Sequence, residues 1–455
     1  MSSREPIGVI GTGYVGLVTA VGFAELGSEV VCVDIDAAKI ERLKAGDIPI
    51  YEPGLAELVE KNASRLTFTT DLSEALDRAR LLFVAVGTPP TYSGDADLSA
   101  VHAVVAAMPP SDKHALVMKS TVPVGTGEAI KRVFEEQGKG GFRYVSCPEF
   151  LKEGSAIDDF LDPDRVVVGD DGGWAGDAVV DLYRPVLNAA NGGQARGELV
   201  RTDIKSAEMV KLASNAFLAT KISFINEIAN VCEETGADVV EVARGMGLDD
   251  RIGPKFLKAG IGFGGSCFPK DVSALKQLAG NSGYHFQLLN AVIEVNELQK
   301  RRVIQKLQKH LGSLVGKRIA LLGLAFKPET DDMREASSLV LSARLIADGA
   351  DVVGYDPIAA EEAGRLLKGV ELADSAAEAI AGADAVVLVT EWPEFKQLDL
   401  TATAEAMRGT VFIDGRNLLD PAAATAAGLV YEGVGRGLAP LADPSTRQAP
   451  APQVA

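Results

Sequence analysis

The chain has 455 residues, which is too long for one ordinary domain and predicts two or three. Hydrophobic residues make up 47% of it and charged residues 24%, a globular balance that leaves room for disorder only at the ends. The net charge of −18 disfavours a nucleic-acid partner and an anionic membrane surface.

Four cysteines, Cys32, Cys147, Cys232 and Cys267, lie far apart in the sequence and form no CxxC pair. This spacing predicts neither a metal site nor a disulfide framework. The first residues lack the apolar core of a signal peptide, and no apolar run reaches the roughly 18 residues that a membrane span needs. We therefore expect a cytoplasmic protein in a reducing compartment, without a membrane partner.

The first part of the chain alternates short apolar runs with amphipathic stretches. Buried strands are predicted at Ile7–Ile10, Val30–Asp34, Leu81–Val86, Ala115–Lys119 and Arg143–Ser146. Helices are predicted at Tyr14–Leu26, Ala37–Ala45 and Gly125–Phe134. Such alternation is typical of a parallel sheet that is covered by helices on both faces.

The pattern changes to helix formers from Arg201 to Leu311. Ser206–Thr235 contains no glycine or proline, which predicts one long helix, either a connector between domains or the spine of a dimer. Strand–helix alternation then returns, with strands predicted at Arg318–Gly323, Asp351–Tyr355, Ala385–Thr390 and Val411–Asp414. The end of the chain from Leu441 is rich in proline and alanine and is expected to be a disordered tail. The predicted fold class is α/β, with two Rossmann-like doubly wound parallel-sheet domains joined by a long central helix and a helical domain.

A dinucleotide-binding motif, Gly11-Thr12-Gly13-Tyr14-Val15-Gly16, follows the first predicted strand and opens a helix. Its glycines permit a tight turn, close approach to a pyrophosphate and close packing of helix on strand. Asp34, at the end of the second strand, would bind the adenosine ribose and repel a 2′-phosphate, which favours NAD over NADP. Lys39 is expected to flank that ribose. The loops Gly87–Pro90 and Thr121–Gly125 also follow strands, where cofactor contacts belong.

The strongest local signal is the glycine-rich run from Gly262 to Asp271, which contains Cys267. Pro269 fits the first position of a helix, which would place Cys267 just before a helix N-terminus and beside Lys270. Both features lower the pKa of a thiol, so we expect a thiolate nucleophile that attacks an aldehyde. The other three cysteines lie in or beside apolar elements and are expected to be structural.

Two further groups of polar residues are candidates for the site. Lys211 and Asn215 lie four residues apart on the long helix and share one face, which indicates either a polar site in an apolar helix or a solvated face. The segment Pro148–Gly154 follows the strand Arg143–Ser146 and carries two carboxylates and a lysine. Alone, this segment is an unremarkable charged loop.

Taken together, five motifs make the chain resemble the UDP-glucose dehydrogenases, within the wider group of four-electron nucleotide-sugar dehydrogenases. They are Gly-Thr-Gly-Tyr-Val-Gly at Gly11, Gly-Thr-Pro at Gly87, Cys-Pro-Glu-Phe at Cys147, Phe-Gly-Gly-Ser-Cys at Phe263 and Lys-Pro-Glu-Thr-Asp-Asp-Met-Arg at Lys327. The resemblance runs from Ile7 to about Gly437. It implies an NAD-binding domain at residues 1–200, a helical dimerisation domain at 201–311 and a UDP-sugar-binding domain at 312–440, followed by the tail at 441–455.

The resemblance also implies roles for individual residues. Contacts with NAD are expected from the glycine motif and from Asp34, Lys39, Thr88, Thr121, Glu153, Lys270 and Arg334. The sugar-nucleotide site is expected to be lined by Glu149, Phe150, Leu151, Lys152, Glu153, Lys211, Asn215, Phe256, Leu257, Lys258, Ala259, Gly260, Gly264 and Lys327, with Arg251 reaching in from a neighbouring subunit. The catalytic group is expected to be the nucleophile Cys267 with Lys211, Asn215, Asp271, Glu149 and Thr121.

The implied reaction is the NAD-dependent oxidation of UDP-glucose to UDP-glucuronate through a thiohemiacetal and a thioester on Cys267, in a homodimer or higher oligomer. GDP-mannose or another UDP-hexose is the alternative substrate. Ser266 stands where the hexosamine branch has histidine, but the GDP-mannose branch shares this serine. The opening Gly11-Thr12-Gly13 and the stretch Ile48–Gly54 resemble the UDP-glucose branch more. A two-electron β-hydroxyacid dehydrogenase would need neither Cys267 nor the second sheet. A third alternative is an NAD-bound redox regulator that oxidises nothing.

Overall fold

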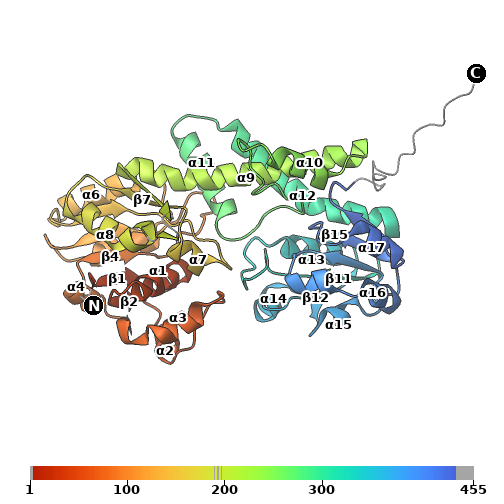
Figure 1. Ribbon diagram of the computed structural model, residues 1–455, viewed down its shortest axis with the longest axis horizontal. Helices are drawn as coiled ribbons and strands as arrows, with labels where there is room; N and C mark the ends of the chain where they lie inside the picture. Colours follow the sequence, from red (N-terminus) through yellow and green to blue (C-terminus); the bar gives the residue numbers. More distant parts are fainter. Residues whose placement is uncertain (1–3, 189, 192–193, 196, 437–455) are drawn as a thin grey trace, which may run out of the picture. The chain divides into compact units, whose positions relative to one another are not determined.

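The computed structural model describes residues 4–188, 190–191, 194–195 and 197–436 (Figure 1). The chain divides into two compact units. Unit 1 contains Met1–Phe217, Ser266–Asn290 and Glu329–Asp331, and unit 2 contains Leu218–Gly265, Ala291–Pro328 and Asp332–Ala455. The expected tail at 441–455 lies outside the described residues.

Within the described part of unit 1, eight strands form one sheet in the order β10-β7-β6-β5-β4-β1-β2-β3. The strands are β1 Ile7–Ile10, β2 Val30–Val33, β3 Leu66–Thr69, β4 Leu81–Val84, β5 Ala115–Met118, β6 Arg143–Ser146, β7 Arg165–Gly169 and β10 Glu198–Thr202. Pairing is parallel from β3 to β6, antiparallel between β6 and β7, and parallel again between β7 and β10. The strand order reverses beside β1, and ligands of such sheets bind at that point.

Alternating strand residues divide the core of unit 1 between the two faces of the sheet. Ile7 and Val9 of β1 belong to one apolar cluster and Ile10 to another, because successive side chains of a strand point to opposite faces. The first cluster includes residues of α1 Tyr14–Glu25, α3 Leu55–Lys61, α7 Ala156–Leu161 and α8 Trp174–Asn188. The second includes residues of α4 Leu72–Arg78, α5 Ser99–Ala107 and α6 Thr126–Glu136. Unit 1 also contains α2 Ala37–Lys44, η1 Ala63–Arg65, β8 Ala190–Asn191, β9 Gln194–Ala195 and α11 Phe268–Asn281.

The described part of unit 2 is built on a second sheet, which is parallel throughout, in the order β13-β12-β11-β14-β15-β16. Its strands are β11 Arg318–Leu322, β12 Asp351–Tyr355, β13 Val370–Leu372, β14 Ala385–Leu388, β15 Val411–Asp414 and β16 Val430–Gly433. The remaining elements are α10 Val239–Gly247, α13 Ser337–Ala347, α14 Ala360–Leu366, α15 Ala376–Ile380, η2 Pro393–Gln397, α16 Leu400–Ala406 and α17 Pro421–Ala426. Two apolar clusters again share the strands between them, so this sheet is also doubly wound.

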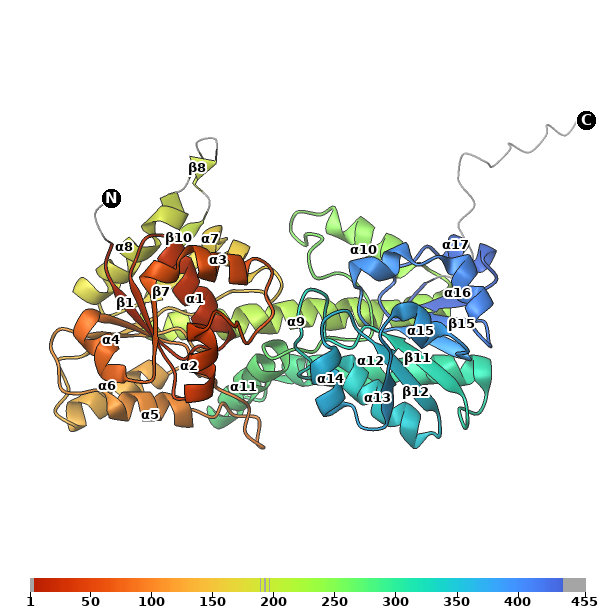
Figure 2. The same ribbon diagram turned by 90° about the horizontal axis from the view of Figure 1, so that it is seen from below.

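The predicted long helix is α9, Ile204–Thr235, and it is continuous over 32 residues (Figure 2). A second long helix, α12, spans Gln287–Leu311. In unit 2 the two helices share an apolar core, to which α9 contributes Ile225 and Ala229 and α12 contributes Leu307. The predicted fold class is therefore confirmed, with two doubly wound α/β sheets and a long helix between them in the chain.

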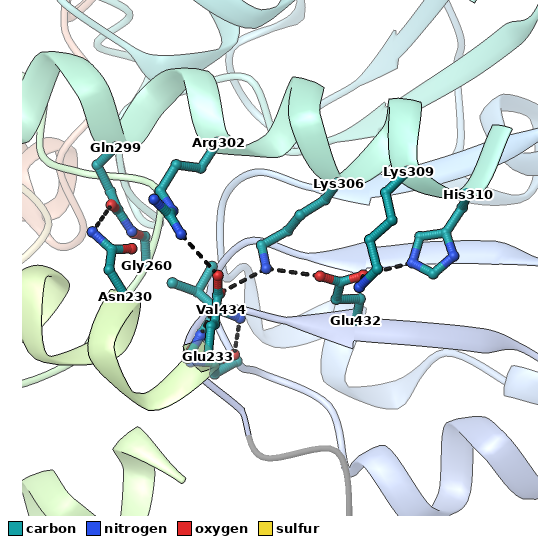
Figure 3. A network of polar contacts seen from close by, with 12 residues as sticks. Asn230, Glu233, Gly260, Gln299, Arg302, Lys306, Lys309, His310, Glu432 and Val434 are labelled. Atoms are coloured by element: carbon teal, nitrogen blue, oxygen red, sulfur yellow. Dashed lines mark hydrogen bonds and ion pairs between the residues drawn. The ribbon is translucent and has the colours of Figure 1, made fainter. Parts of the chain in front are cut away.

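An ion-pair network ties α9, α12 and β16 together in unit 2 (Figure 3). Lys306 of α12 donates to Glu233 of α9 at 2.6 Å and to Glu432 of β16 at 2.9 Å. His310 and Lys309 also lie against Glu432, at 2.5 and 3.0 Å. Burial opposes ionisation of Glu432, but these donors outweigh it and lower the pKa of its carboxyl to about 2. The network thus fixes the last strand of the sheet to both long helices.

Candidate active site

The glycine motif has the geometry of a dinucleotide cradle. Gly11 has φ 96°, and a Cβ on it would lie 2.6 Å from the carbonyl oxygen of Ala85. A Cβ on Gly16 would lie 1.9 Å from the carbonyl oxygen of Gly11, so helix and turn meet without room for a side chain. Gly13 is the N-cap of α1, and a Cβ there would meet nothing within 4 Å. The open position lies at the helix N-terminus, where backbone N–H groups favour a pyrophosphate.

Asp34 directly follows β2, one residue beyond the end of the strand, and forms the polar end of this cradle. Its Oδ2 accepts hydrogen bonds from Thr12 N at 2.8 Å and Thr12 Oγ1 at 2.7 Å. Lys39, which was expected to flank the ribose, forms an ion pair with Asp34 at 3.1 Å. Burial opposes ionisation, but the N–H groups of Asp36 and Thr12 outweigh it and lower the pKa of the Asp34 carboxyl. An ionised acceptor at this position fits the ribose hydroxyls of NAD.

Sequence reasoning missed Ile35, whose side chain is 98% exposed immediately after Asp34. Ile35 follows the end of β2, where the adenosine ribose is expected to bind. The available signal was a bulky aliphatic residue directly after the acidic strand end.

The loops after β4 and β5, which neighbour each other in the sheet, contact each other. Thr88 Oγ1 donates to the carbonyl oxygen of Thr121 at 2.9 Å, and Thr88 is buried. Glu208 of α9 holds the following turn, because its carboxylate accepts from Gly125 N at 2.7 Å and Gly127 N at 2.8 Å. Sequence reasoning missed Glu208, which connects the loop of Thr121 to the helix that carries the polar candidates.

Lys211 and Glu149 form a buried ion pair at 2.8 Å, with side chains only 4% and 5% exposed. The expectation of a polar site in the long helix is thus met, since Lys211 and Asn215 are both buried. Burial favours the neutral forms, but the carboxylates of Glu149 and Asp271 and the sulfur of Cys267 raise the pKa of Lys211. Lys211, the N–H of Leu151 and Lys119 likewise outweigh burial and lower the pKa of Glu149. Lys211 is therefore a hydrogen-bond donor at neutral pH, not a base.

Asp271, in the first turn of α11, is held by two hydrogen-bond donors. Asn215 Nδ2 donates to its Oδ2 at 2.6 Å, and Lys270 Nζ donates to its Oδ1 at 2.7 Å. The side chain of Asp271 is buried. A buried carboxylate with two fixed donors and close to Cys267 can accept or relay a proton.

Cys267 is the N-cap of α11, and of the four cysteines it is the one that is partly exposed. Pro269 was expected at the first position of this helix. The helix begins at Phe268, so Pro269 occupies the second position. Lys270 also differs from expectation, since it binds Asp271 and has no described bond to the thiol. The other three cysteines are buried, as predicted.

The expected thiolate is not supported in the free protein. Burial and the negative charge of Glu149 raise the pKa of the Cys267 thiol to about 11, although Lys211 acts in the opposite direction. The sequence argument counted the helix N-terminus and Lys270, but it could not include a carboxylate that lies 118 positions earlier in the chain. The thiol is therefore protonated at neutral pH.

The segment after β6 supplies further candidate residues. Glu153 accepts from Ser266 Oγ at 3.4 Å, which places it near Cys267, the next residue along the chain. The ring of Phe150 lies 3.9 Å from the Arg165 guanidinium and 5.5 Å from Lys211 Nζ. Lys152, which is exposed, forms an ion pair with the partly buried Asp159.

Lys119, missed from the sequence, lies behind this segment. It is 5% exposed, and its Nζ donates to Tyr183 Oη at 2.9 Å and to Pro148 O at 3.4 Å. Its one sequence signal is a lysine at the end of an apolar strand. Its charge helps to keep Glu149 ionised.

The remaining predicted residues belong to unit 2, and their roles stay predictions. Four of them are buried, namely Leu257, Ala259, Gly260 and Gly264, whereas Lys258 is exposed. Phe256 has φ 66°. Arg251 and Arg334 form ion pairs with Asp249 and Asp332, at 2.6 and 2.7 Å. Lys327 Nζ lies 5.3 Å from the ring of Phe326.

No group of three or more metal-ligating side chains occurs among the residues that the structure describes. No helix in these ranges is long and apolar enough to cross a membrane.

Family models match the chain in three segments. Residues 5–187 match the NAD binding domain of the UDP-glucose/GDP-mannose dehydrogenase family, residues 205–298 its central domain and residues 320–421 its UDP binding domain. UDP-glucose 6-dehydrogenase TuaD of Bacillus subtilis is 48% identical over 98% of this chain and 96% of its own length. UDP-glucose 6-dehydrogenase AglM of Haloferax volcanii is 45% identical over 91% of this chain and 97% of its own.

Solved structures agree with these sequence matches. A UDP-glucose dehydrogenase from Pyrobaculum islandicum superposes with a TM-score of 0.87 at 40% identity, over 96% of this chain and 98% of that one. A UDP-D-ManNAc dehydrogenase from Pyrococcus horikoshii gives 0.82 at 29% identity, over 95% and 100%. The chain is thus an NAD-dependent oxidoreductase that belongs to the UDP-glucose/GDP-mannose dehydrogenase family.

Proposed function

We propose that the chain oxidises the C6 primary alcohol of UDP-glucose to a carboxylate, with two NAD consumed per sugar, through covalent intermediates on Cys267. The observation that carries the proposal is the group in unit 1 that surrounds this partly exposed cysteine: the Lys211–Glu149 pair and the Asn215–Asp271 pair. A dehydrogenase that made only one oxidation would not need a cysteine at this position.

UDP-glucose is preferred over the alternatives because the relatives named as UDP-glucose 6-dehydrogenases reach 45–48% identity over most of the chain. The hexosamine and GDP-mannose dehydrogenases of known structure lie at 25–29%. GDP-mannose and other UDP-hexoses remain the second candidates. The family match leaves no support for a β-hydroxyacid dehydrogenase.

NAD, when bound, supplies the two-electron acceptor for each of the two oxidations. The open N-terminus of α1 at Gly13 and the Asp34 carboxylate would hold it, while the loops of Thr88 and Thr121 extend the same sheet edge. Glu153 contacts Ser266, the residue before Cys267, and Lys270 contacts Asp271, so we assign Glu153 and Lys270 to the nicotinamide side of the site.

The residues around Cys267 can perform the proton transfers. Asp271, fixed by Asn215 and Lys270, takes the proton of the C6 hydroxyl, directly or through a water that Lys211 also holds. Because Lys211 is protonated, it and the Asn215 amide donate to the oxyanion that forms when a thiolate adds to the aldehyde.

Covalent capture then completes the reaction. The sulfur of Cys267 forms a C–S bond to the aldehyde carbon, whose C=O bond opens to the oxyanion. The thiol proton passes to Asp271, which has released the first proton to water. The second oxidation converts the thiohemiacetal to a thioester, and water cleaves the C–S bond to return the thiol and release the acid. Since burial and Glu149 raise the pKa of the thiol in the free protein, its proton has to leave by the time the C–S bond forms.

The first test is to mix the purified protein with NAD and UDP-glucose and to count NADH per sugar consumed. We expect two NADH per sugar from the unaltered chain. Cys267→Ser should release no NADH beyond that of the first oxidation, and Cys267→Ala should form no thioester. One NADH per sugar, or unchanged product formation by Cys267→Ser, would refute the covalent step. No NADH with any nucleotide sugar would favour the redox-regulator alternative.

We further propose that the chain forms a homodimer through α9. Phe217, Phe224 and Val231 are 65%, 49% and 57% exposed, and their seven-residue spacing puts them on one face of the helix. An apolar stripe of this kind marks an interaction surface. In sedimentation, Phe224→Glu should lower the mass toward that of a monomer, whereas Val315→Glu, at an exposed apolar residue elsewhere, should not. A dimer that survives Phe224→Glu would refute this face as the interface.

The assignment of residues 1–200, 201–311 and 312–440 to cofactor binding, dimerisation and UDP-sugar binding is part of the same proposal, as is a contact from Arg251 to the substrate of a neighbouring subunit. A cytoplasmic location fits the four free cysteines, because thiols persist in a reducing compartment.

A further inference from the structure

The stretch Ile48–Gly54 precedes α3 and has no role in the proposed mechanism. Its acidic residue, Glu52, is only 6% exposed. The Glu52 carboxylate accepts from Gly154 N at 2.6 Å through Oε2 and from Ala156 N at 2.7 Å through Oε1. Oε2 also accepts from the hydroxyl of Tyr14. A buried carboxylate is stable only when its oxygens are satisfied in this way.

The partners of Glu52 come from two parts of unit 1 that are remote in sequence. Tyr14 begins α1 within the dinucleotide motif, whereas Gly154 and Ala156 precede and begin α7. Burial and the Glu52 carboxylate raise the pKa of the Tyr14 phenol, so this hydroxyl remains a donor at neutral pH. Glu52 therefore connects the helix of the cofactor cradle to the segment that follows β6.

That segment leads to the nucleophile. Glu153, next to Gly154, accepts from Ser266 Oγ at 3.4 Å and from Thr330 Oγ1 at 3.3 Å. Ser266 Oγ lies 3.6 Å from Cys267 Sγ. A continuous series of contacts thus runs from Tyr14 through Glu52 and the Glu153 loop to Cys267.

We propose that Glu52 is a positioning residue. Its carboxylate fixes the loop that carries Glu153 against helix α1 of the cofactor cradle, and this loop in turn orients Ser266 and Cys267 toward the site of oxidation. Because its two oxygens already bind Tyr14, Gly154 and Ala156, we assign Glu52 no direct contact with cofactor or substrate. The inference rests on the proposed function, because it assumes that cofactor and nucleophile act on one substrate.

Glu52→Gln tests the proposal with little change in volume. The amide keeps one acceptor oxygen but turns an NH2 group toward one of the backbone N–H donors, which releases the loop. Glu60→Gln is the matched control, because Glu60 is an exposed carboxylate on α3 in the next segment and its change removes the same charge. Tyr14→Phe removes only the tie to α1 and leaves the bonds to Gly154 and Ala156 intact.

Four quantities should be measured on each folded variant: kcat, KM for NAD, the Kd for NAD by calorimetry, and the rate at which iodoacetamide alkylates Cys267. For Glu52→Gln we expect kcat to fall about tenfold or more, since small misplacements of reacting groups are costly. We also expect weaker NAD binding and an altered alkylation rate. Tyr14→Phe should weaken NAD binding with a smaller loss of kcat, and it keeps the test valid should Glu52→Gln fail to fold.

Two results would overturn the proposal. The first is a folded Glu52→Gln with all four quantities within about twofold of Glu60→Gln. The second is a loss of activity in Glu52→Gln that equals the loss of molecules whose Cys267 thiol can still be labelled. Such a result would mean that the variant only lowers the amount of folded protein, so that Glu52 has a merely structural role. If the unaltered chain released no NADH with UDP-glucose, the proposed function would fail, but NAD affinity and alkylation rate would still decide the role of Glu52.

Discussion

Alkylation of Cys267 in the free enzyme should be slow at neutral pH and should accelerate about tenfold for each pH unit, because only the thiolate reacts. With a thiol pKa of about 11, roughly one molecule in 3,000 carries the thiolate at about pH 7.5. The structural cause is the burial of the sulfur together with the charge of Glu149, against which Lys211 acts only in part.

Variants of the buried pair should move this profile in opposite directions. Glu149→Gln removes a negative charge near the sulfur and leaves Lys211 in place, so alkylation at a given pH should become faster. Lys211→Met removes the positive charge, so alkylation should become slower. A change of one pKa unit in either direction corresponds to about tenfold in rate below the pKa.

The assay is the rate of iodoacetamide labelling of Cys267, followed by peptide mass spectrometry between pH 7 and 9.5. Cys267→Ser gives the background from Cys32, Cys147 and Cys232, which are buried and should react slowly. A labelling rate that is high at pH 7 and level up to pH 8 would show a preformed thiolate. That result would refute the reasoning from burial and restore the expectation drawn from the helix N-terminus and Lys270.

Two further predictions concern the cradle and the second sheet. Gly13→Ala should leave thermal stability nearly unchanged, because a Cβ on Gly13 meets only open space, but it should weaken NAD binding in calorimetry, because that space is where the pyrophosphate is expected. Gly16→Ala should prevent folding, because a Cβ there would overlap the carbonyl oxygen of Gly11. Tight NAD binding by Gly13→Ala would contradict the cradle. Glu432→Gln should destabilise unit 2 at pH 7 by about 3 kcal/mol, because the carboxyl pKa lies at about 2 instead of 4.5. The stabilisation is complete above pH 4.5 and is lost as the pH falls toward 2, so the difference should shrink to about 1 kcal/mol at about pH 3. Urea unfolding measures this difference in a Trp174→Phe background, where the fluorescence of Trp392 reports on unit 2. A difference in unfolding free energy that does not change with pH would count against the ion-pair network.

Local patterns were enough to predict most of the elements. The strands Ile7–Ile10, Arg143–Ser146, Asp351–Tyr355 and Val411–Asp414 begin and end where the apolar runs do. Other predicted strands end one or two residues early, because Asp34, Lys119, Gly323 and Thr390 belong to the loops that follow. Strand and helix periodicity is a property of consecutive residues, so one sequence can reveal it.

Parts of the site were predictable for the same reason. Lys211 and Asn215 share a face because they are one turn apart, and Cys267 caps a helix because glycines and a proline surround it. The glycine motif was readable because each of its glycines answers a local backbone demand.

The sequence by itself determined the two doubly wound sheets, the long helix and the glycine motif of an NAD-binding domain, and it singled out Cys267 as the candidate nucleophile. Only the tertiary structure decided that Glu149 pairs with Lys211, that the thiol is protonated in the free protein, and that Glu52 links Tyr14 to the loop of Glu153. The reason is that charge and burial act through space. Groups that are more than 60 positions apart in the chain set the pKa of a side chain or hold a loop, and no local pattern records such distances.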